Sequence, residues 1–325
     1  MKKENYKKSA QSTIELQILA LRKLKSFIGN SFNQAVKAIG KCTSKTILIG
    51  VGKSGHVASQ IAASLSSVGA PSFALSASDC SHGDLGSITQ KDILILISNS
   101  GETAELKNII QYANRNKITL IGITSKKNSI LYKTSDIKLI IPETKESGPG
   151  GIVPSSSIIT QASFGSSLVI AVMKDKKHGI LSFKNFHPAG SLSKKLLTVE
   201  DLMVKKNNKI PFVSENLRMK DALKIMSKKK LGVLIVRNKR RSTVGIITDG
   251  DVRLLSKKKN NLQFLLVKKV MTKKPITISK DILAAKALSL MNSKKITCLC
   301  VNSNKSKHKT IGLIHIHNIL EANVQ

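Results

Sequence analysis

The chain has 325 residues, of which 41% are hydrophobic, and a formal net charge of +35. This length is enough for two domains, and four cysteines are too few for a disulfide scaffold, which excludes a small disulfide-stabilised protein. Only seven of the 54 basic residues are arginine and aromatic residues make up 3%, so side chains that read or stack on bases are scarce. We therefore predict no nucleic-acid partner and favour A/T-rich codon usage as the origin of the lysine excess. The alternative that stays open is that the positive charge serves an anionic small substrate.

The sequence gives no targeting or membrane signal. No continuous apolar run approaches the roughly 20 residues of a membrane helix. The N-terminal segment is basic but lacks the apolar core of a signal peptide. From these features we expect a cytoplasmic protein without a membrane partner, whose cysteines stay reduced.

The first 197 residues alternate between helical and strand-like patterns. Apolar residues recur at helical spacing up to about residue 40, and residues 157–174 predict a long buried helix. Between these two regions lie five short aliphatic segments, each apolar on both faces: 46–51, 72–75, 93–98, 119–124 and 137–141. Such strands are typical of a parallel sheet covered by helices on both sides. We predict an α/β, doubly wound parallel sheet over 41–197, preceded by a helical segment over 1–40.

A different pattern begins after residue 197, where two segments repeat with a period of about 65–68 residues. DALKIMSKKKLGVLIV (221–236) and VGIITDGDVRLL (244–255) correspond to AAKALSLMNSKKITCLCV (284–301) and IGLIHIHNILEA (311–322). Each copy predicts a helix, a strand, a polar turn, a second strand and a second helix. We therefore predict two α+β modules, 198–262 and 268–325, that pack on each other because one alone offers a small core.

Glycines and hydroxyls gather where the predicted strands end. In IGVGKSGHVAS (49–59), Gly50, Gly52 and Gly55 would let the backbone approach an anion at a helix N-terminus, and Ser54 adds a hydroxyl. The spacing matches G-x-G-x-x-G, but no suitably placed acid ends the next strand, which disfavours a dinucleotide site.

The stretch SNSGET carries three hydroxyls within six residues, Ser98, Ser100 and Thr103. Neutral donors around a helix start suit a phosphate monoester. The alternative is an ordinary helix cap, although the acid of a capping box is missing. A third hydroxyl-rich loop, around Ser155 and Ser156, precedes the long helix.

Taken together, GVGKSGH, SHGDLG, ISNSGET and PSSS resemble a sugar isomerase (SIS) domain, and the two repeats resemble tandem CBS modules. With FHPAGSL (186–192) between them, the whole chain resembles the arabinose 5-phosphate isomerases of Gram-negative bacteria. The resemblance implies interconversion of D-ribulose 5-phosphate and D-arabinose 5-phosphate, the first step of Kdo and lipopolysaccharide biosynthesis. It also implies a homotetramer and no cofactor.

By position in these motifs, the resemblance implies that the catalytic residues are Lys53, Glu105, Glu146 and His187. It associates His82 with inhibitory metal binding. The implied substrate and phosphate contacts are Gly52, Ser54, Gly55, His82, Ser98, Asn99, Ser100, Gly101, Thr103, Ser155 and Ser156. An aldose–ketose isomerisation needs a base, an acid and a group that stabilises the enediolate. Base and acid stay open among Glu105, Glu146 and His187; we favour Glu146 as base, His187 for ring opening and Lys53 for charge.

The chain departs from the family pattern at three positions: Asp79 in SASDCSH, Ala189 in place of a glycine, and Ser166 in place of an acid. We expect these departures to affect the catalytic efficiency but not the class of reaction. Two other functions stay open, a non-catalytic sugar-phosphate-binding regulator and an SIS isomerase acting on another sugar phosphate.

CBS modules often bind adenosine nucleotides through a Thr-x-x-Asp element. The first repeat keeps Thr248 and Asp251, whereas the second has His315-Ile316-His317-Asn318. We therefore expect at most one adenine-nucleotide or sugar-nucleotide regulatory site. The pair His315 and His317 lacks a third ligand and does not predict a metal site.

Overall fold

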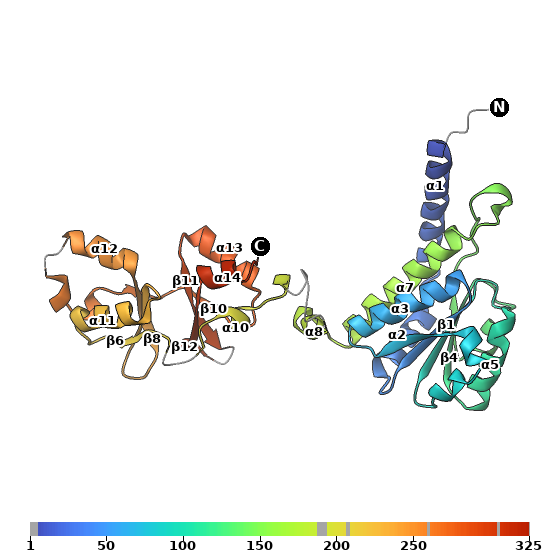
Figure 1. Ribbon diagram of the computed structural model, residues 1–325, viewed down its shortest axis with the longest axis horizontal. Helices are drawn as coiled ribbons and strands as arrows, with labels where there is room; N and C mark the ends of the chain where they lie inside the picture. The colour runs from blue at the N-terminus through green and yellow to red at the C-terminus, as the bar shows by residue number, and fades with distance from the viewer. Residues whose placement is uncertain (1–5, 187–193, 206–208, 259–260, 304–305, 325) are drawn as a thin grey trace. The chain divides into compact units, whose positions relative to one another are not determined.

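The computed structural model describes residues 6–186, 194–205, 209–258, 261–303 and 306–324. The chain divides into two compact units, Met1–Phe186 and His187–Gln325 (Figure 1). Each unit has its own sheets and its own cores, and each is described by itself.

Unit 1 is built on a five-stranded parallel sheet with the order β2-β1-β3-β4-β5. Its strands are β1 (Thr46–Gly50), β2 (Ser72–Ser76), β3 (Ile93–Ile97), β4 (Thr119–Thr124) and β5 (Ile137–Ile140). Its helices are α1 (Tyr6–Lys25), α2 (Asn30–Lys41), α3 (Lys53–Ser67), α4 (Ala77–Cys80), α5 (Ala104–Arg115), α6 (Ile130–Thr134), α7 (Ser156–Asp175) and α8 (Ile180–Asn185). This arrangement confirms the predicted α/β class.

The sheet is covered on both faces because alternate residues of its central strands point in opposite directions. Leu48 and Ile95 pack with α2, α3 and α7, whereas Ile47 and Leu94 pack with α4, α5 and α6. β1 and β3 are buried throughout. β2 differs from the sequence-based expectation: it is an edge strand, and none of its residues is fully buried.

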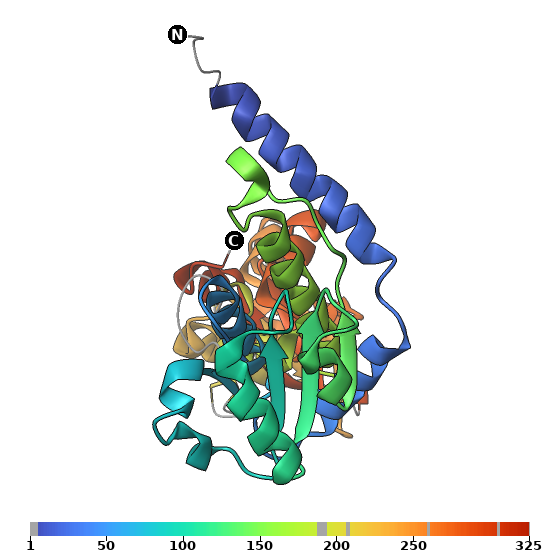
Figure 2. The ribbon, with the colours of Figure 1, turned by 90° about the vertical axis from the view of Figure 1, so that its right-hand side faces the viewer.

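Helix α7 is the central helix of one face and packs against α1, α2 and α3. By length and composition alone it could cross a membrane, but half of it is buried inside unit 1, as in a core helix of a folded domain. The N-terminal half of α1 extends beyond the rest of unit 1 (Figure 2).

Unit 2 contains the two repeats, each with a short mixed sheet and two main helices. The strands are β6 (Phe212–Ser214), β7 (Val233–Arg237), β8 (Thr243–Thr248), β9 (Thr272–Lys273), β10 (Thr277–Ser279), β11 (Cys298–Ser303) and β12 (Ser306–His315). The helices are α10 (Val199–Leu202), α11 (Met219–Lys229), α12 (Asp249–Lys258), α13 (Ala284–Lys294) and α14 (Ile316–Glu321).

The two repeats exchange backbone at their edges. β9, from the second repeat, pairs with β8 of the first. Val204, from the first repeat, pairs with Leu313 of β12 in the second, with N–H to O distances of 2.8 and 3.2 Å. A shared core containing Ile235 and Cys300 lies between the repeats, which confirms that they pack on each other.

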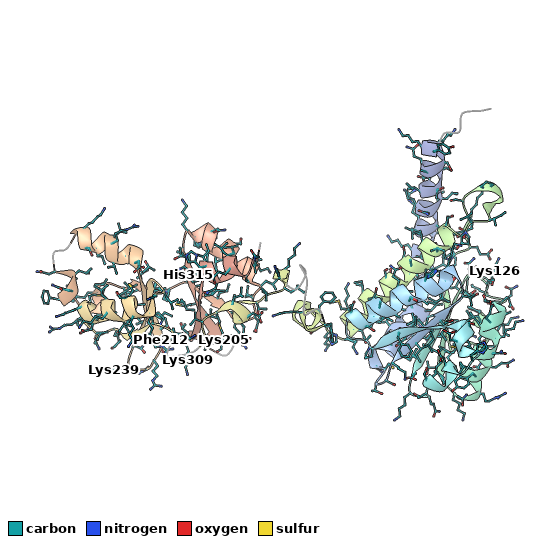
Figure 3. All side chains as sticks on the ribbon, viewed as in Figure 1. Lys126, Lys205, Phe212, Lys239, Lys309 and His315 are labelled. Carbon is teal, nitrogen blue, oxygen red and sulfur yellow. The ribbon has the colours of Figure 1, made fainter. Side chains whose placement is uncertain are left out.

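An arginine adds a polar link between the repeats. The Arg237 guanidinium lies 3.1 Å from the ring centroid of Phe212 and donates to the carbonyl oxygen of Thr310 at 2.9 Å (Figure 3, where Phe212 is labelled). Thr243 and Thr310 join the same repeats through their hydroxyls, 2.8 Å apart.

Candidate active site

The carboxyl ends of β1 and β3 form the switch point of the unit 1 sheet. β1 is connected to β2 on one side, whereas β3 leads to β4 on the other, so the loops after β1 and β3 diverge at neighbouring positions. In open parallel sheets, ligands bind in the crevice outside such a point. Both motif-bearing loops, GVGKSGH and SNSGET, lie here.

The loop after β1 is shaped by glycines. Gly52 has φ of 56° and precedes the first residue of α3, Lys53. A Cβ atom at Gly50 would lie 2.7 Å from the backbone of Ser54, and one at Gly55 would lie 2.9 Å from the carbonyl oxygen of Gly50. The glycines therefore let the start of α3 press against the end of β1.

The loop after β3 is a turn held by its own hydroxyls. The buried Ser98 hydroxyl accepts from the N–H of Gly101 at 3.0 Å and lies 2.7 Å from the Thr103 hydroxyl. Gly101 has φ of 67°, and a Cβ atom there would clash with the Ser129 hydroxyl. Thr103 is the N-cap residue of α5 but makes no side-chain hydrogen bond to this helix. The first turn of α5 therefore follows an ordered, hydroxyl-rich loop.

The neighbouring strand supports this turn from the other side. The carbonyl oxygen of Asn99 accepts from the Thr124 hydroxyl at 3.1 Å and from the Ser125 hydroxyl at 2.8 Å. Lys126 follows and forms an ion pair with Glu143 at 2.6 Å (Figure 3, where Lys126 is labelled). Asn99 thus contributes its backbone oxygen to the loop geometry, and the polar residues after β4 hold the loop in place.

The two acids after SNSG have different surroundings. Glu102 accepts from the backbone N–H of Ile130 at 2.7 Å and so joins the β3 loop to the start of α6. Glu105, in the first turn of α5, lines a cavity of about 460 Å³ together with Gly52 and Gly55. In the described part of the chain, no hydrogen bond or ion pair engages the exposed Glu105 carboxylate. Glu105 is therefore available for chemistry, whereas Glu102 has a structural partner.

Sequence reasoning did not single out His56, which also lines this cavity. Among the described residues that surround the cavity, His56 and Glu105 are the two with ionisable side chains. The signal was in the motif GVGKSGH, since His56 lies in the first turn of α3 and directly follows the lining residue Gly55. Ser76 and Ser78, at the start of α4, line the cavity as well.

Lys53 and His82 lie near this region without lining the cavity. Lys53 is the exposed first residue of α3, beside the lining residue Gly52. His82 is exposed and follows α4, whose first turn lines the cavity. Within the described residues, no group of three or more histidine, cysteine or acidic side chains could hold a metal ion.

Glu146 has a very different environment, because its carboxylate caps α7. It accepts from the backbone N–H groups of Ser155 at 2.7 Å, Ser156 at 2.8 Å and Ser157 at 3.2 Å. Burial raises the pKa of Glu146, but the hydrogen bonds from Ser157, Ser155 and Ser156 outweigh burial and hold the pKa below its usual value. Glu146 is thus an ionised, fully engaged carboxylate, which makes it a weak proton acceptor.

Ser155 and Ser156 are used by this cap. The Ser155 hydroxyl lies 3.1 Å from Glu146 and also accepts from the N–H of Ser147 at 2.9 Å. The position that an anion would occupy at the start of α7 is therefore filled by the chain's own carboxylate. The predicted catalytic histidine, His187, and the departure at Ala189 lie outside the described residues.

Unit 2 contains a second cavity, of about 540 Å³, between the repeats. Thr248 lines it, as do three cationic side chains, Arg253, Lys274 and Lys295. The Asp251 carboxylate accepts from the N–H and the hydroxyl of Thr248, both at 2.8 Å, so this pair forms a cap at the start of α12. Asp249 also lines the cavity, whereas Asp251 does not. With three cations and one acid among the described lining residues, the cavity suits an anionic ligand.

The corresponding position of the second repeat is His315, labelled in Figure 3. The ring nitrogen Nδ1 of His315 accepts from the backbone N–H of His317 at 3.3 Å. The backbone N–H of His315 donates to the side-chain oxygen of Asn318 at 3.1 Å. His315 lines the same cavity. Burial, and secondarily the neighbouring His317, lowers the pKa of His315. Both repeats therefore have a helix cap at this position. The capping side chain is the acid Asp251 in the first repeat and the amide Asn318 in the second.

Comparison with known proteins agrees with this architecture. The chain matches the SIS domain over residues 18–171 and the CBS domain twice, over 199–258 and 267–324. The uncharacterized protein RP505 of Rickettsia prowazekii (strain Madrid E) is 38% identical over 320 residues, which cover 98% of each chain. Arabinose 5-phosphate isomerase KdsD of Yersinia pestis is 35% identical over 321 residues, covering 98% of this chain and 97% of that protein.

Among solved structures, that of E. coli CFT073 c3406 in complex with arabinose 5-phosphate has a TM-score of 0.53 at 32% identity. The matched region covers 55% of this chain and 95% of the c3406 chain.

Proposed function

Because this chain belongs to the arabinose 5-phosphate isomerase (KdsD) family of aldose–ketose isomerases with an SIS domain and tandem CBS domains, we propose that it interconverts D-ribulose 5-phosphate and D-arabinose 5-phosphate. The reaction moves a proton between C1 and C2 through an enediol, with a second proton transfer between O1 and O2. The chemistry requires a phosphate anchor, a base, an acid and a group that stabilises negative charge on the enediolate.

The observation that carries this proposal is the position of Glu105. Its carboxylate lines a cavity at the switch point, one helical turn after the hydroxyl-rich loop Ser98–Thr103. We assign the phosphate to this loop, with Ser100, Gly101 and Thr103 as contacts. The sugar then extends along the glycine loop of β1, where Gly52 and Gly55 leave room for it.

The roles that follow are proposals from chemistry. Glu105 is favoured over Glu146 as the base that moves the C1/C2 proton, because Glu146 already accepts three backbone N–H groups and has a lowered pKa. Glu146 then acts by fixing the start of α7. Lys53 stabilises the enediolate charge, and His187 serves ring opening, as the family resemblance implies.

The test is incubation of the purified protein with D-ribulose 5-phosphate, with the product identified by NMR. Formation of D-arabinose 5-phosphate by the wild type, together with its loss in Glu105→Gln, is the expected result. A folded protein that binds D-ribulose 5-phosphate without turnover would leave a non-catalytic sugar-phosphate-binding protein. Turnover of another sugar phosphate alone would leave an SIS isomerase of different specificity.

The same family membership supports three further proposals. The reaction is the first step of Kdo, and hence lipopolysaccharide, biosynthesis, and it takes place in the cytoplasm. The active form is a homotetramer of the 35.2 kDa chain. Light scattering on the purified protein measures the assembly directly, and a monomeric mass would contradict it.

We also propose that the unit 2 cavity binds an adenine nucleotide or a sugar nucleotide as a regulator. Thr248, which lines the cavity and which the Asp251 carboxylate holds in place, would face the ribose. Arg253, Lys274 and Lys295 would face the phosphates. Addition of AMP should raise the melting temperature of the wild type but not of Asp251→Ala. An equal rise in both proteins would place the nucleotide elsewhere.

A further inference from the structure

Gln161 is a buried polar residue of α7 that the proposed mechanism does not use. Only 2% of it is exposed, and its helix packs against α3. Its Oε1 accepts a hydrogen bond of 3.1 Å from the hydroxyl of Ser54. Ser54 is the second residue of α3, in the glycine loop of β1, and is 107 residues away in sequence.

The other half of the Gln161 side chain is unsatisfied. Its Nε2 is buried and finds no hydrogen-bond partner among the described residues. The hydroxyl of Ser156, earlier on the same helix and fully buried, likewise has none in the described part of the chain. A buried amide with unpaired donors costs stability, and Met or Leu would fill the same volume without this cost. Packing alone therefore does not explain a glutamine here.

The hydrogen bond to Gln161 determines what Ser54 can offer a ligand. Oε1 is an acceptor only, so the single hydroxyl proton of Ser54 is directed at Gln161. Ser54 is half-buried and does not itself line the cavity, but it lies between the lining residues Gly52 and Gly55. The lone pairs of its oxygen stay free, so they can accept from a hydroxyl group of a sugar bound there. A phosphate dianion offers acceptors only and gains nothing from this group.

We infer that Gln161 is a positioning residue that holds Ser54 as a hydrogen-bond acceptor for a hydroxyl of the substrate. This inference rests on the proposed sugar-phosphate function and deepens it. It separates two parts of the site: the β3 loop binds the phosphate, whereas Ser54, through Gln161, selects the sugar part.

The experiment compares Gln161→Met, Ser54→Ala and the double variant with the wild type. We measure melting temperature, KM and kcat for D-ribulose 5-phosphate, and the Kd of inorganic phosphate. Gln161→Met should raise KM by about 5-fold to 15-fold, as expected for losing one or two neutral hydrogen bonds, with kcat changed less. Its melting temperature should stay equal or rise. The double variant should resemble Ser54→Ala, because both changes break the same interaction.

The Kd of inorganic phosphate should stay within about twofold of the wild-type value in all variants, because none of them removes a hydrogen bond to phosphate. Thr160→Val is the matched control. Thr160 is the buried neighbour of Gln161, and among the described residues its hydroxyl bonds only to its own helix, to the carbonyl oxygen of Ser156 at 2.7 Å. This control should leave KM unchanged.

Three results would overturn the inference: a lower melting temperature with unchanged KM for Gln161→Met, additive effects in the double variant, or an equal loss of inorganic phosphate affinity. If the wild type shows no turnover, calorimetric binding of D-ribulose 5-phosphate replaces KM, with the same expected ratios. Failure of the proposed reaction is thus distinguishable from failure of the Ser54–Gln161 coupling.

Discussion

The N-termini of α5 and α7 both follow hydroxyl-rich loops, but they are satisfied in different ways. At α7, the Glu146 carboxylate accepts from three consecutive backbone N–H groups. At α5, the N-cap residue Thr103 makes no side-chain cap, and its hydroxyl bonds to Ser98 instead. Within the described residues, the chain therefore supplies its own anion at the start of α7 and none at the start of α5.

This difference shows that hydroxyl-rich loops before helices do not by themselves mark ligand sites. Positive helix ends attract anions of any origin, including a carboxylate from the same chain. Of the two, only the start of α5 is left for an external phosphate, and Glu105 lies one turn further along that helix.

Replacing Glu105 with Gln should lower kcat by about 100-fold to 10,000-fold, the usual contribution of a general base. The free energy of unfolding should stay nearly constant, because in the described structure the Glu105 carboxylate has no hydrogen bond or ion pair to lose. Steady-state kinetics and urea unfolding measure the two quantities.

Glu143→Gln is the control for Glu105→Gln. It removes a surface ion pair with Lys126, which is worth about 0–1 kcal/mol, and should not change kcat. A kcat within a few-fold of wild type in Glu105→Gln would remove Glu105 from the mechanism and return Glu146 to the position of base.

Replacing Glu146 with Gln should destabilise unit 1 by about 1.5–3 kcal/mol, since a charged acceptor of several backbone N–H groups is lost. The effect depends on pH. The folded-state pKa of Glu146 lies below its unfolded value of 4.5, so its contribution is complete above that value and is lost as the pH falls through the folded pKa. Unfolding curves of wild type and variant should therefore converge in acid; a constant difference down to low pH would contradict the capping role.

Thr103→Val should weaken binding of inorganic phosphate by about 10-fold to 150-fold, the loss of one hydrogen bond to a charged group. Ser155→Ala, the equivalent change at α7, should leave phosphate affinity unchanged, because its partner is Glu146. Calorimetric titration measures both. A matching loss in Ser155→Ala would restore the expectation that the α7 loop binds phosphate.

The smallest effect is expected for Glu102→Gln. Glu102 accepts one backbone N–H, that of Ile130, from an exposed position. The amide oxygen of glutamine can still accept this bond, so the cost should stay below about 1 kcal/mol and KM should change less than in Thr103→Val. A large rise in KM would show that Glu102, too, faces the substrate.

The sheet of unit 1 was predictable because each central strand is a short, uniformly aliphatic segment between helical patterns. The exposure of β2 was not, since edge position depends on the strand order β2-β1-β3-β4-β5 and leaves little local signal. The hydroxyl-rich loop after β3 was predictable, because its three hydroxyls directly follow an aliphatic strand, whereas the individual site residues were proposed from the family resemblance. The hydrogen bond between Glu146 and Ser155 was not predictable, because no sequence pattern shows that the loop between them folds back on itself. The hydrogen bond between Ser54 and Gln161 joins residues 107 positions apart. Such distant pairs require the folded structure.

The exchange of edge backbone in unit 2 has a consequence for how the two repeats persist together. β9 completes the sheet of the first repeat, and Val204 completes that of the second. Deleting either copy would strip its sister of an edge and expose unpaired backbone, which favours aggregation. Neither repeat can therefore be lost without damage to the other. A single side chain is under no such constraint, and the second repeat has Asn318 where the first has Asp251.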